Sequence, residues 1–515
     1  MKKDIYIYDT TLRDGSQMEG INFSVQDKIK VAQKLNDFGV DFIEGGWPGS
    51  NPKDDEFFKE IKKYKLKSEI VAFSATALKG KTPTNDPLIQ KVLKAKTKWV
   101  TVFGKTWDLH TRQILKINYT EALKLIFSTI NFFTARGRKV IFDAEHFFDG
   151  FKSNPKFALD CLKSAARGGA VNLSLCDTNG GTLPGEIRNI FQEVKKEIKT
   201  PLGIHAHNDS GVAVANSLVA ASEGAQIIQG TFGGLGERAG NADLGVITTD
   251  LQIKKGKKIL PPEKLKGLTQ LVNFIFETAN LPPPKNLPFV GASAFTHKGG
   301  IHASAVRKNP KSYEHINPGL VGNFSRVTIS ELSGKSNVVA VARRLGFKLQ
   351  PNSARTREIL NKVKSLERAG FYFETAEASF ALLILRSQKN YSAPFEVLDY
   401  FVTNLKDGEA KATVKLKVGS EIREYAASGN GPVNALDVAT RRAVTKFFPQ
   451  IKNVELKDYK VRILDGDSAT AAKTRVLIES SNGHENWSTV GCSGNIIEAS
   501  WQALIDSLEY AIWRA

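Results

Sequence analysis

The chain of 515 residues contains little cysteine, with only Cys161, Cys176 and Cys492. No two of them lie close together in the sequence, which argues against a disulfide framework or a thiolate zinc site and fits a reducing cytosol. Long apolar runs are also absent, since no stretch approaches the roughly 18 residues of a membrane-spanning helix. The N-terminus has a basic pair but no long apolar core or small-residue cleavage site. It therefore does not resemble a signal peptide, and we expect a cytoplasmic protein without membrane association.

Acidic residues are the scarcer charged class, with 53 Asp and Glu against 72 Lys and Arg and a formal net charge of +19. This excess is compatible with a nucleic-acid binder, a membrane-surface binder or an enzyme of anionic metabolites. The lysines are spread over the expected helix surfaces, as at residues 59–67 and 254–258. That distribution is typical of solvated faces, so we expect no nucleic-acid partner.

The first half of the chain alternates between short apolar, β-rich runs and segments with helical spacing. The runs are nearly continuous in apolar residues, as in strands buried on both faces of a parallel sheet. The expected strands are residues 5–10, 41–46, 69–73, 99–103, 139–145, 171–177, 203–208 and 226–232. The expected helices are residues 25–38, 52–63, 87–96, 119–136, 155–167, 184–198, 212–223 and 239–253. Eight such units predict an α/β fold with a (β/α)8 TIM barrel, with a doubly wound sheet as the alternative.

The second half of the chain has a different character. A proline-rich segment at residues 281–288 predicts an extended linker, and a helical, basic stretch follows it. Further along, two hairpin-then-helix patterns begin at Thr413 and Thr474, each with a Gly-Asn corner. They indicate either an internal pseudo-repeat or a small α+β domain with a chance similarity. We predict a barrel domain at residues 1–280, a helical linker subdomain at 281–385 and an α+β domain at 386–515.

The strongest local signal is His205-Ala206-His207, at the end of the seventh expected strand. Residues two apart in a strand point to the same face, so both imidazoles would project into the barrel mouth. The chain has only 8 histidines, and the alternative interpretation is a hydrogen-bonded pair in the core. Asp14 can reach the pair, because it follows strand one, which is a close neighbour of strand seven in such a barrel. Imidazole pairs suit divalent transition metals.

Other polar residues follow other expected strands. The glycine-rich segment at residues 233–241 differs in spacing and position from a dinucleotide-binding fingerprint. We interpret it as a loop that approaches the ligand closely, with Asn241 able to reach the metal. Glu44, Glu145 and Asp177 end three more strands, and each is a candidate either for proton transfer or for a structural ion pair.

Three motifs together carry a family resemblance: D-T-T-L-R-D-G from Asp9, G-I-H-A-H-N-D from Gly203 and G-E-R-A-G-N from Gly236. They resemble the metal-dependent TIM-barrel family of Claisen-condensing acyltransferases and related lyases, which includes the isopropylmalate and homocitrate synthases. The end of the chain is similar to the regulatory domain of that family. The resemblance therefore covers essentially the whole sequence. Further segments similar to the branch of the family that uses pyruvate begin at Glu44, Asp143, Cys176 and His297.

The resemblance implies a role for individual residues. A divalent ion (Mn²⁺, Mg²⁺ or Zn²⁺) would be held by Asp14, His205, His207 and Asn241 and would polarise the keto group of a 2-oxo acid. The catalytic residues are expected to be Arg13, Glu145, His302 and Tyr313. The residues expected to bind the substrate are Arg13, Thr178 and Glu44.

The implied reaction condenses pyruvate with the co-substrate acetyl-CoA and water to give (R)-citramalate and CoA. The alternative is a larger 2-oxo acid, as in isopropylmalate and homocitrate synthases. The resemblance also implies a homodimer, in which His302 and Tyr313 complete the site of the partner subunit, and feedback inhibition by isoleucine. A polyanion-binding protein and a regulatory paralogue without activity are the remaining hypotheses.

One segment departs from the family pattern. Residues 74–79, after the third expected strand, lack the basic pair that relatives usually carry there. The sequence therefore does not predict which residues of this segment contact the acyl donor or the substrate. Lys79 and Lys81 are the candidates to replace the missing basic pair.

Overall fold

The chain folds into two compact units. The computed structural model describes residues 3–328, 334–404, 406, 409–464, 469 and 471–515. The first unit contains the chain up to Phe295 together with Ile316–Phe324, and the second contains Thr296–His315 and Ser325–Ala515. The domain boundaries predicted after residues 280 and 385 stay a prediction. Among the described residues, no helix has the length and apolar character needed to cross a bilayer.

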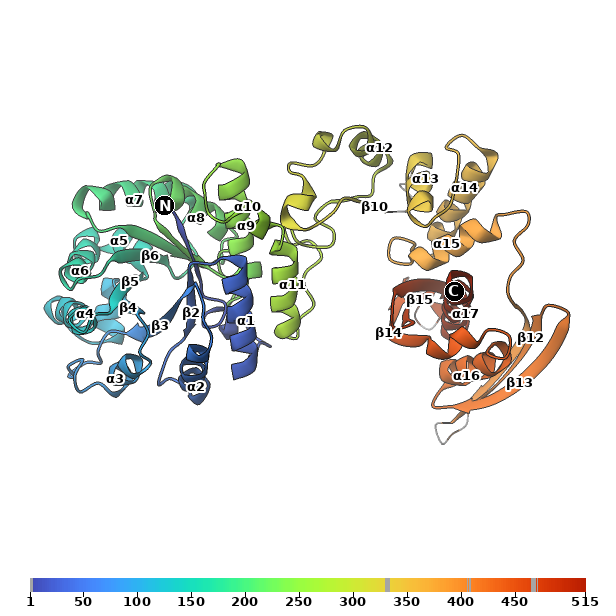
Figure 1. The fold of residues 1–515 in the computed structure, drawn as a ribbon, viewed down its shortest axis with the longest axis horizontal. Helices are drawn as coiled ribbons and strands as arrows, with labels where there is room; N and C mark the ends of the chain where they lie inside the picture. Colours follow the sequence, from blue (N-terminus) through green and yellow to red (C-terminus); the bar gives the residue numbers. More distant parts are fainter. Residues whose placement is uncertain (1–2, 329–333, 405, 407–408, 465–468, 470) are drawn as a thin grey trace. The chain divides into compact units, whose positions relative to one another are not determined.

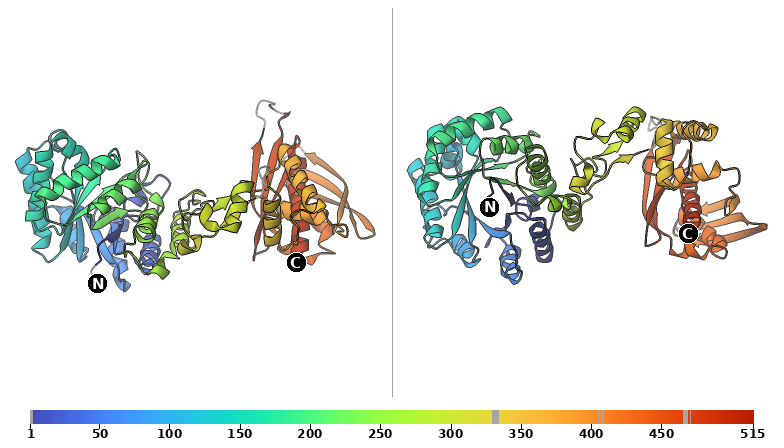
Figure 2. Two further views of the ribbon diagram at one scale, coloured as in Figure 1. Left: turned by 90° about the horizontal axis from the view of Figure 1, so that it is seen from above. Right: turned by 45° about the horizontal axis from the view of Figure 1, so that its top comes forward.

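The first unit contains a closed barrel of eight parallel strands, as Figures 1 and 2 show. Strand β1 pairs with both β2 and β8, which closes the barrel. Each strand begins and ends within two residues of its predicted bounds, so the predicted barrel is confirmed. The strands are β1 (Tyr6–Asp9), β2 (Phe42–Gly46), β3 (Glu69–Ala75), β4 (Trp99–Lys105), β5 (Lys139–Glu145), β6 (Asn172–Asp177), β7 (Leu202–Ala206) and β8 (Ile227–Gly230).

Helices surround the barrel, and their ends carry the expected signals. Ser24 and Asp27 form a capping box at the start of α1, and Pro stands in the first turn of α2, α3, α6 and α7. The α-helices are α1 (Val25–Phe38), α2 (Pro52–Glu60), α3 (Pro87–Lys94), α4 (Tyr119–Thr134), α5 (Phe147–Ser153), α6 (Pro155–Arg167), α7 (Pro184–Glu197), α8 (Ala213–Ser222), α9 (Leu244–Thr249), α10 (Pro262–Leu265) and α11 (Leu268–Thr278). Shorter 3-10 and π turns are η1 (Gly15–Gln17), η2 (Ile61–Lys63), η3 (His110–Ile114), η4 (Phe232–Gly234), η5 (Asp250–Lys254) and η7 (Pro318–Val321).

The start predicted for the last barrel helix is wrong. The sequence predicts a helix over residues 239–253, whereas α9 begins at Leu244. Gly240 has φ = +89°, and Asn241 forms an isolated bridge with His207 instead of entering a helix. Asp243 then caps α9 by accepting a hydrogen bond from the backbone N–H of Gly245. The loop is therefore longer than expected, and it holds Asn241 against the end of β7.

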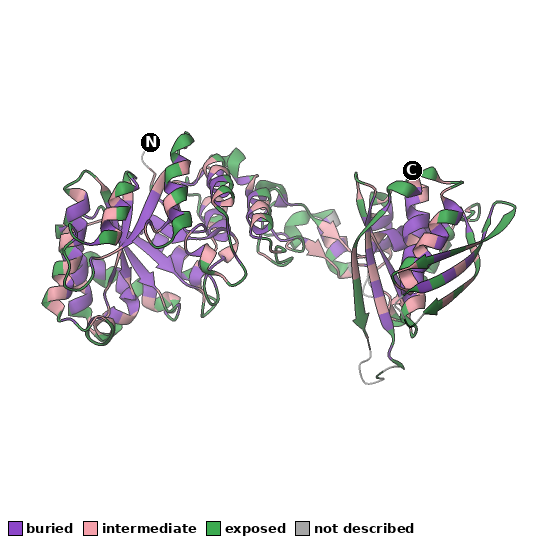
Figure 3. Ribbon diagram, turned by 90° about the horizontal axis from the view of Figure 1, so that it is seen from below, coloured by how far each residue is buried: buried purple, intermediate pink, exposed green. Residues whose placement is uncertain are grey.

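Apolar side chains close one end of the barrel interior. Tyr8, Phe42, Val71, Ile141 and Ile227 form a small buried cluster inside the ring of strands. A much larger apolar core lies between the strands and the surrounding helices. Figure 3 shows the strands buried along their length and the helices exposed on their outer faces. Polar side chains are left to gather at the carboxyl ends of the strands, where barrel enzymes carry their chemistry.

The second unit begins with short strands and helices. Strands β9 and β10 pair in parallel, and the buried Asn337 donates hydrogen bonds to the carbonyls of Lys298 and Thr328. These elements are β9 (Thr296–His297), α12 (Gly300–Lys308), η6 (Pro310–Ser312), β10 (Arg326–Val327), α13 (Lys335–Arg344), α14 (Ala354–Arg368) and α15 (Glu377–Arg386).

The end of the chain is a true structural repeat. Each copy has three antiparallel strands and one helix, and each first strand has an irregularity in register at the same point, between Val397 and Asp399 and between Leu456 and Asp458. The elements are β11 (Glu396–Asn404), β12 (Ala410–Val418), β13 (Glu421–Gly429) and α16 (Pro432–Val444), then η8 (Pro449–Asn453), β14 (Glu455–Ile463), β15 (Thr474–Ser481), β16 (Asn486–Ser493) and α17 (Ile496–Arg514). The predicted hairpin-then-helix pattern is confirmed, but each copy has one more strand.

Candidate active site

Four predicted ligand residues come together at the carboxyl ends of the barrel strands. Asp14 lies in the turn after β1, where the Thr10 carbonyl accepts backbone hydrogen bonds from Asp14 and Gly15. His205 lies in β7, and His207 follows it. The bridge between His207 and Asn241 attaches the glycine-rich loop to the end of β7. The turn after β1, the alternation of side chains along β7 and this bridge therefore place the four residues at the same end of the barrel.

The ring nitrogens and the carboxylate face one another at short range. His205 Nε2 lies 3.1 Å from Asp14 Oδ2 and 3.2 Å from His207 Nε2. The candidate ligand atoms of these three residues all lie within 4.8 Å of one another. Together with Asn241, they are 2–6% exposed. Such a mixed set of nitrogen and oxygen donors suits a divalent cation.

Unpaired buried atoms point to the same conclusion. Among the described residues, Asn241 Oδ1 and His207 Nδ1 are buried and have no hydrogen-bond partner. Asn241 Nδ2 donates to the Leu235 carbonyl, which leaves its oxygen as the free acceptor. A side chain at Gly236 would lie 2.1 Å from Asn241 Nδ2, so only glycine admits this arrangement. The residues present therefore fit a divalent metal ion.

The electrostatics of Asp14 and His207 favour metal-binding protonation states, whereas at His205 the effect of Asp14 outweighs that of burial and raises the pKa. Burial opposes the charge of Asp14, but Arg13 and His205 outweigh burial and hold the Asp14 pKa well below its usual range. Burial and the neighbouring His205 lower the pKa of His207 to about 3. At neutral pH the cluster therefore offers an ionised carboxylate and a neutral imidazole, which are the forms that bind metals.

Arg13 lies beside the ligand cluster, and three groups hold it there. Its Nε donates to Glu44 Oε1 at 2.6 Å, and its Nη1 lies 3.2 Å from Asp14 Oδ2. Its guanidinium carbon is 3.9 Å from the centre of the Phe73 ring. Glu44 is fully buried and also accepts a hydrogen bond from the Tyr8 hydroxyl. Glu44 thus orients Arg13, and its role in binding substrate stays a prediction.

Glu145 ends β5 and Thr178 follows β6, at the same end of the barrel. Glu145 Oε2 lies 2.6 Å from Lys105 Nζ, and the register of β4 against β5 places these two residues opposite each other. Thr178 Oγ1 accepts a hydrogen bond from the backbone N–H of His146 at 2.9 Å. Sequence patterns did not identify Lys105, because the predicted strand ends at residue 103 whereas β4 continues to Lys105.

Sequence patterns also did not identify three aromatic rings near Arg13. Phe73 and Phe103 stack with ring centres 5.1 Å apart, and the Trp47 ring packs edge-on against both. We call Trp47, Phe73 and Phe103 the aromatic wall. Trp47 follows β2, and Phe73 and Phe103 lie two residues before the ends of β3 and β4, near the strand ends that carry the predicted polar residues. Position, rather than residue type, was the signal that could have identified them.

His302 and Tyr313 belong to the second unit, where their rings stack with centres 4.3 Å apart. Both side chains are exposed, Tyr313 to 46%. The structure brings these two predicted residues together with each other. Their participation in a barrel site of a partner subunit stays a prediction. In the segment without the basic pair, Lys79 Nζ donates to the Lys116 carbonyl, so its role as a substitute also stays open.

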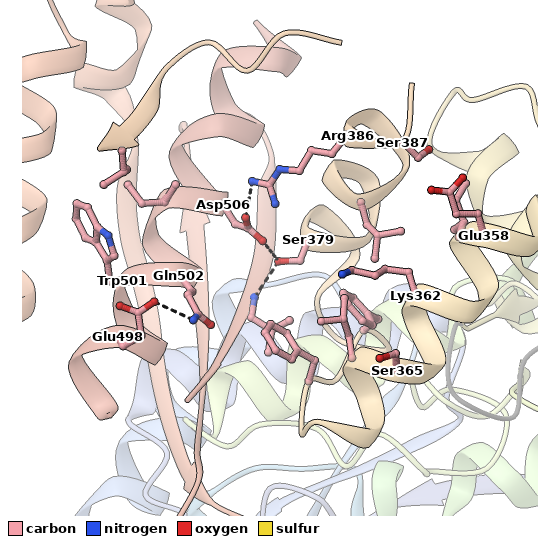
Figure 4. Close-up of a pocket in the computed structure, with 18 of the residues that line it drawn as sticks. Glu358, Lys362, Ser365, Ser379, Arg386, Ser387, Glu498, Trp501, Gln502 and Asp506 are labelled. Carbon is pink, nitrogen blue, oxygen red and sulfur yellow. Dashed lines mark hydrogen bonds and ion pairs between the residues drawn. The ribbon is translucent and has the colours of Figure 1, made fainter. Parts of the chain in front are cut away.

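The second unit also contains a cavity of about 1070 Å³ between α14, α15, β11 and α17, shown in Figure 4. Apolar side chains such as Leu366, Leu383 and Ile505 line it. Ser379 and Arg386 both hydrogen-bond Asp506 on its wall. None of the residues that the sequence predicts as functional lines this cavity.

Three family models match consecutive parts of the chain. Residues 4–275 match the HMGL-like model, residues 289–370 match the homocitrate synthase post-HMGL domain-like model, and residues 374–512 match the LeuA allosteric (dimerisation) domain. The order of the three matches agrees with the order of elements described above.

Similar proteins match the chain over nearly its full length. It is 50% identical to an (R)-citramalate synthase of Aquifex aeolicus, over 100% of this chain and 99% of that protein. It is 48% identical to an (R)-citramalate synthase of Geobacter sulfurreducens, over 99% and 98%. It is 31% identical to a 2-isopropylmalate synthase of Methanocaldococcus jannaschii, over 98% and 94%. The chain therefore belongs to the HMGL-like family that includes the (R)-citramalate and 2-isopropylmalate synthases.

Proposed function

We propose that the protein is an (R)-citramalate synthase, which condenses pyruvate with acetyl-CoA and water to give (R)-citramalate and CoA. The observation that carries this proposal is the buried cluster of Asp14, His205, His207 and Asn241 beside Arg13. It occurs in a chain that is similar from end to end to proteins of that name. The proposed protein is a cytoplasmic enzyme of isoleucine biosynthesis.

The four residues would hold a divalent ion: Mn²⁺, Mg²⁺ or Zn²⁺. When bound, the ion supplies Lewis-acid polarisation of the keto group of the 2-oxo acid. Asp14 contributes the negative charge, and the low pKa of His207 keeps its imidazole available down to acidic pH. Asn241 contributes the neutral oxygen that has no other partner among the described residues.

Arg13 would stabilise the oxygen on which charge develops. Its Nε is held by Glu44 and its position over Phe73 is fixed, so the guanidinium needs little reorganisation during the reaction. Thr178 would orient the carboxylate of the 2-oxo acid. Glu145 would move the proton, and Lys105 Nζ lies 2.6 Å from its carboxylate.

The aromatic wall supports pyruvate as the 2-oxo acid. Phe73 lies directly against Arg13, and Phe103 and Trp47 fill the space behind it. Bulky rings at this place favour a substrate whose side chain is a single methyl group. A wall of smaller residues would be expected for the larger 2-oxo acids of the isopropylmalate and homocitrate synthases.

A homodimer is part of the proposal. The first strands of the two repeats expose large apolar side chains, among them Phe401 at 68% and Ile463 at 60%. Exposed apolar patches of this kind are typical of interaction surfaces. A second copy of the chain would cover these strands, and His302 and Tyr313 of one subunit would act on acetyl-CoA in the site of the other.

Feedback inhibition by isoleucine completes the proposal. The support for it is the match of residues 374–512 to an allosteric domain. Millimolar isoleucine should lower the rate of the full-length enzyme without being consumed. A full-length enzyme whose rate is unchanged by millimolar isoleucine would contradict this part of the proposal and leave the assigned reaction in place.

A panel of 2-oxo acids tests the reaction. CoA release from acetyl-CoA should be fastest with pyruvate, and a chelator should abolish it until divalent metal is restored. Preference for 2-oxoisovalerate would assign the chain to the isopropylmalate synthases instead. Salt-dependent retention on DNA without any metal-dependent CoA release would favour the polyanion-binding alternative.

A further inference from the structure

Gln229 lies on β8, directly behind the ligand cluster, and is fully buried. Its Oε1 lies 2.9 Å from His205 Nδ1. Its Nε2 donates to Asp143 Oδ1 at 2.7 Å and to Ser174 Oγ at 3.0 Å. One amide therefore connects a predicted metal ligand on β7 to polar groups on β5 and β6.

The partners of the amide nitrogen fix which end of Gln229 faces His205. The Ser174 hydroxyl donates its own hydrogen to Asn172 Oδ1 at 3.3 Å, so the Ser174 oxygen is left as an acceptor. The Asp143 carboxyl oxygen is also an acceptor. Two acceptors at this end require the NH₂ group, so the amide oxygen must point toward His205.

The orientation of the amide then decides the tautomer of His205. An amide oxygen can only accept, so His205 Nδ1 must carry the hydrogen. In a neutral imidazole this leaves the lone pair on Nε2. Nε2 is the atom that faces Asp14 and His207 at 3.1 and 3.2 Å.

We propose that Gln229 is a positioning residue for the metal centre: held by Asp143 and Ser174, it fixes His205 in the tautomer that presents Nε2 to a divalent cation. The inference rests on the metal site of the proposed function. Outer partners of metal-binding histidines typically change metal affinity by about 10–100-fold when removed. Gln229 differs from a direct carboxylate partner, because the amide relays the orientation without placing a second negative charge against the imidazole.

Metal binding to the full-length protein tests the relay without using activity. Titration of metal-free wild type and Gln229→Leu with Mn²⁺ in a calorimeter should show affinity about 10–100-fold weaker in the variant. Gln229→Glu keeps an acceptor for the Nδ1 hydrogen but loses the NH₂ group that Asp143 and Ser174 hold, so its affinity should lie between those of wild type and Gln229→Leu. Ser174→Ala removes one of two anchors and leaves Asp143 in place, so it should also change affinity little.

The tautomer itself provides a second measurement. Nitrogen NMR of metal-free protein labelled at histidine, with His205→Gln to assign the signal, should show His205 protonated at Nδ1 in wild type. Gln229→Leu should lose this preference. Thermal unfolding shows whether each variant folds. If Gln229→Leu does not fold, the affinity of Gln229→Glu and the tautomer of His205 in wild type still test the relay.

Three outcomes distinguish a failure of this inference about Gln229 from a failure of the proposed metal site. Wild type that binds no divalent metal would overturn the metal site itself. Wild type that binds Mn²⁺ while Gln229→Leu binds within twofold of it would overturn the relay alone. A wild-type His205 with its hydrogen on Nε2 and none on Nδ1 in the metal-free protein would also overturn the relay.

Discussion

The two units differ in how far their predicted functional residues are buried. In the barrel, Asp14, His205, His207 and Asn241 are buried and fixed by neighbours on several strands. In the second unit, His302 and Tyr313 are exposed, and the outer strands of both repeats expose apolar side chains. The barrel therefore builds its candidate metal site from its own buried residues, whereas the second unit leaves its predicted catalytic residues and apolar strands at the surface.

The largest expected effect is the loss of a barrel ligand. His207→Ala removes a buried imidazole from the cluster and should abolish Mn²⁺ binding and lower kcat by roughly a thousandfold or more, because the ion supplies several kcal/mol of charge stabilisation. Calorimetry and CoA release measure the two effects. His484→Ala, in the exposed turn before β16, is the control and should change neither. Full activity of His207→Ala would remove the barrel cluster from the mechanism.

Arg13→Ala is expected to have the next largest effect. It removes a preorganised donor to the developing oxyanion, which typically contributes about 3–4 kcal/mol, so kcat should fall by about a hundredfold to a thousandfold. Arg13→Lys should recover little, since an ammonium cannot reproduce both the Glu44 contact and the stacking on Phe73. A fall in affinity for pyruvate with unchanged kcat would assign Arg13 to binding alone.

His302→Ala tests whether the second unit contributes to catalysis. If His302 serves in proton transfer, kcat should fall by about a hundredfold while Mn²⁺ affinity stays that of wild type. Mixing His302→Ala with His207→Ala subunits should restore part of the activity, because one mixed site per dimer would be intact. Absence of any recovery in a mixture shown to exchange subunits would contradict a site shared between subunits.

The smallest expected effect concerns the exposed strands. Phe401→Glu places a charge on the proposed dimer surface and should weaken self-association by about tenfold, or ~1.4 kcal/mol. Sedimentation velocity over a range of concentrations measures it. Ser420→Glu, in the turn between β12 and β13, adds the same charge outside that surface and should leave association unchanged. Equal behaviour of the two variants would place the interface elsewhere.

Strand and helix periodicity predicted much of the barrel, because buried parallel strands produce continuous apolar runs that are easy to recognise. The same rule failed at β11 and β14, whose side chains are mostly exposed and whose apolar pattern is therefore weak. It also failed at residues 239–243, where a pairing between Asn241 and His207, distant in the sequence, overrides local helix preference. Local patterns predict structure best where burial is uniform.

The sequence by itself determined the two-residue spacing of His205 and His207, the Arg13-Asp14 pair after the first strand and the glycines that let Asn241 approach. Tertiary structure alone decided that Glu44 holds Arg13, that Phe73 lies against its guanidinium and that Gln229 connects His205 to Asp143. The physical reason is sequence separation. Closing the barrel brings side chains from different strands within hydrogen-bond distance, and no local periodicity records which of them will meet.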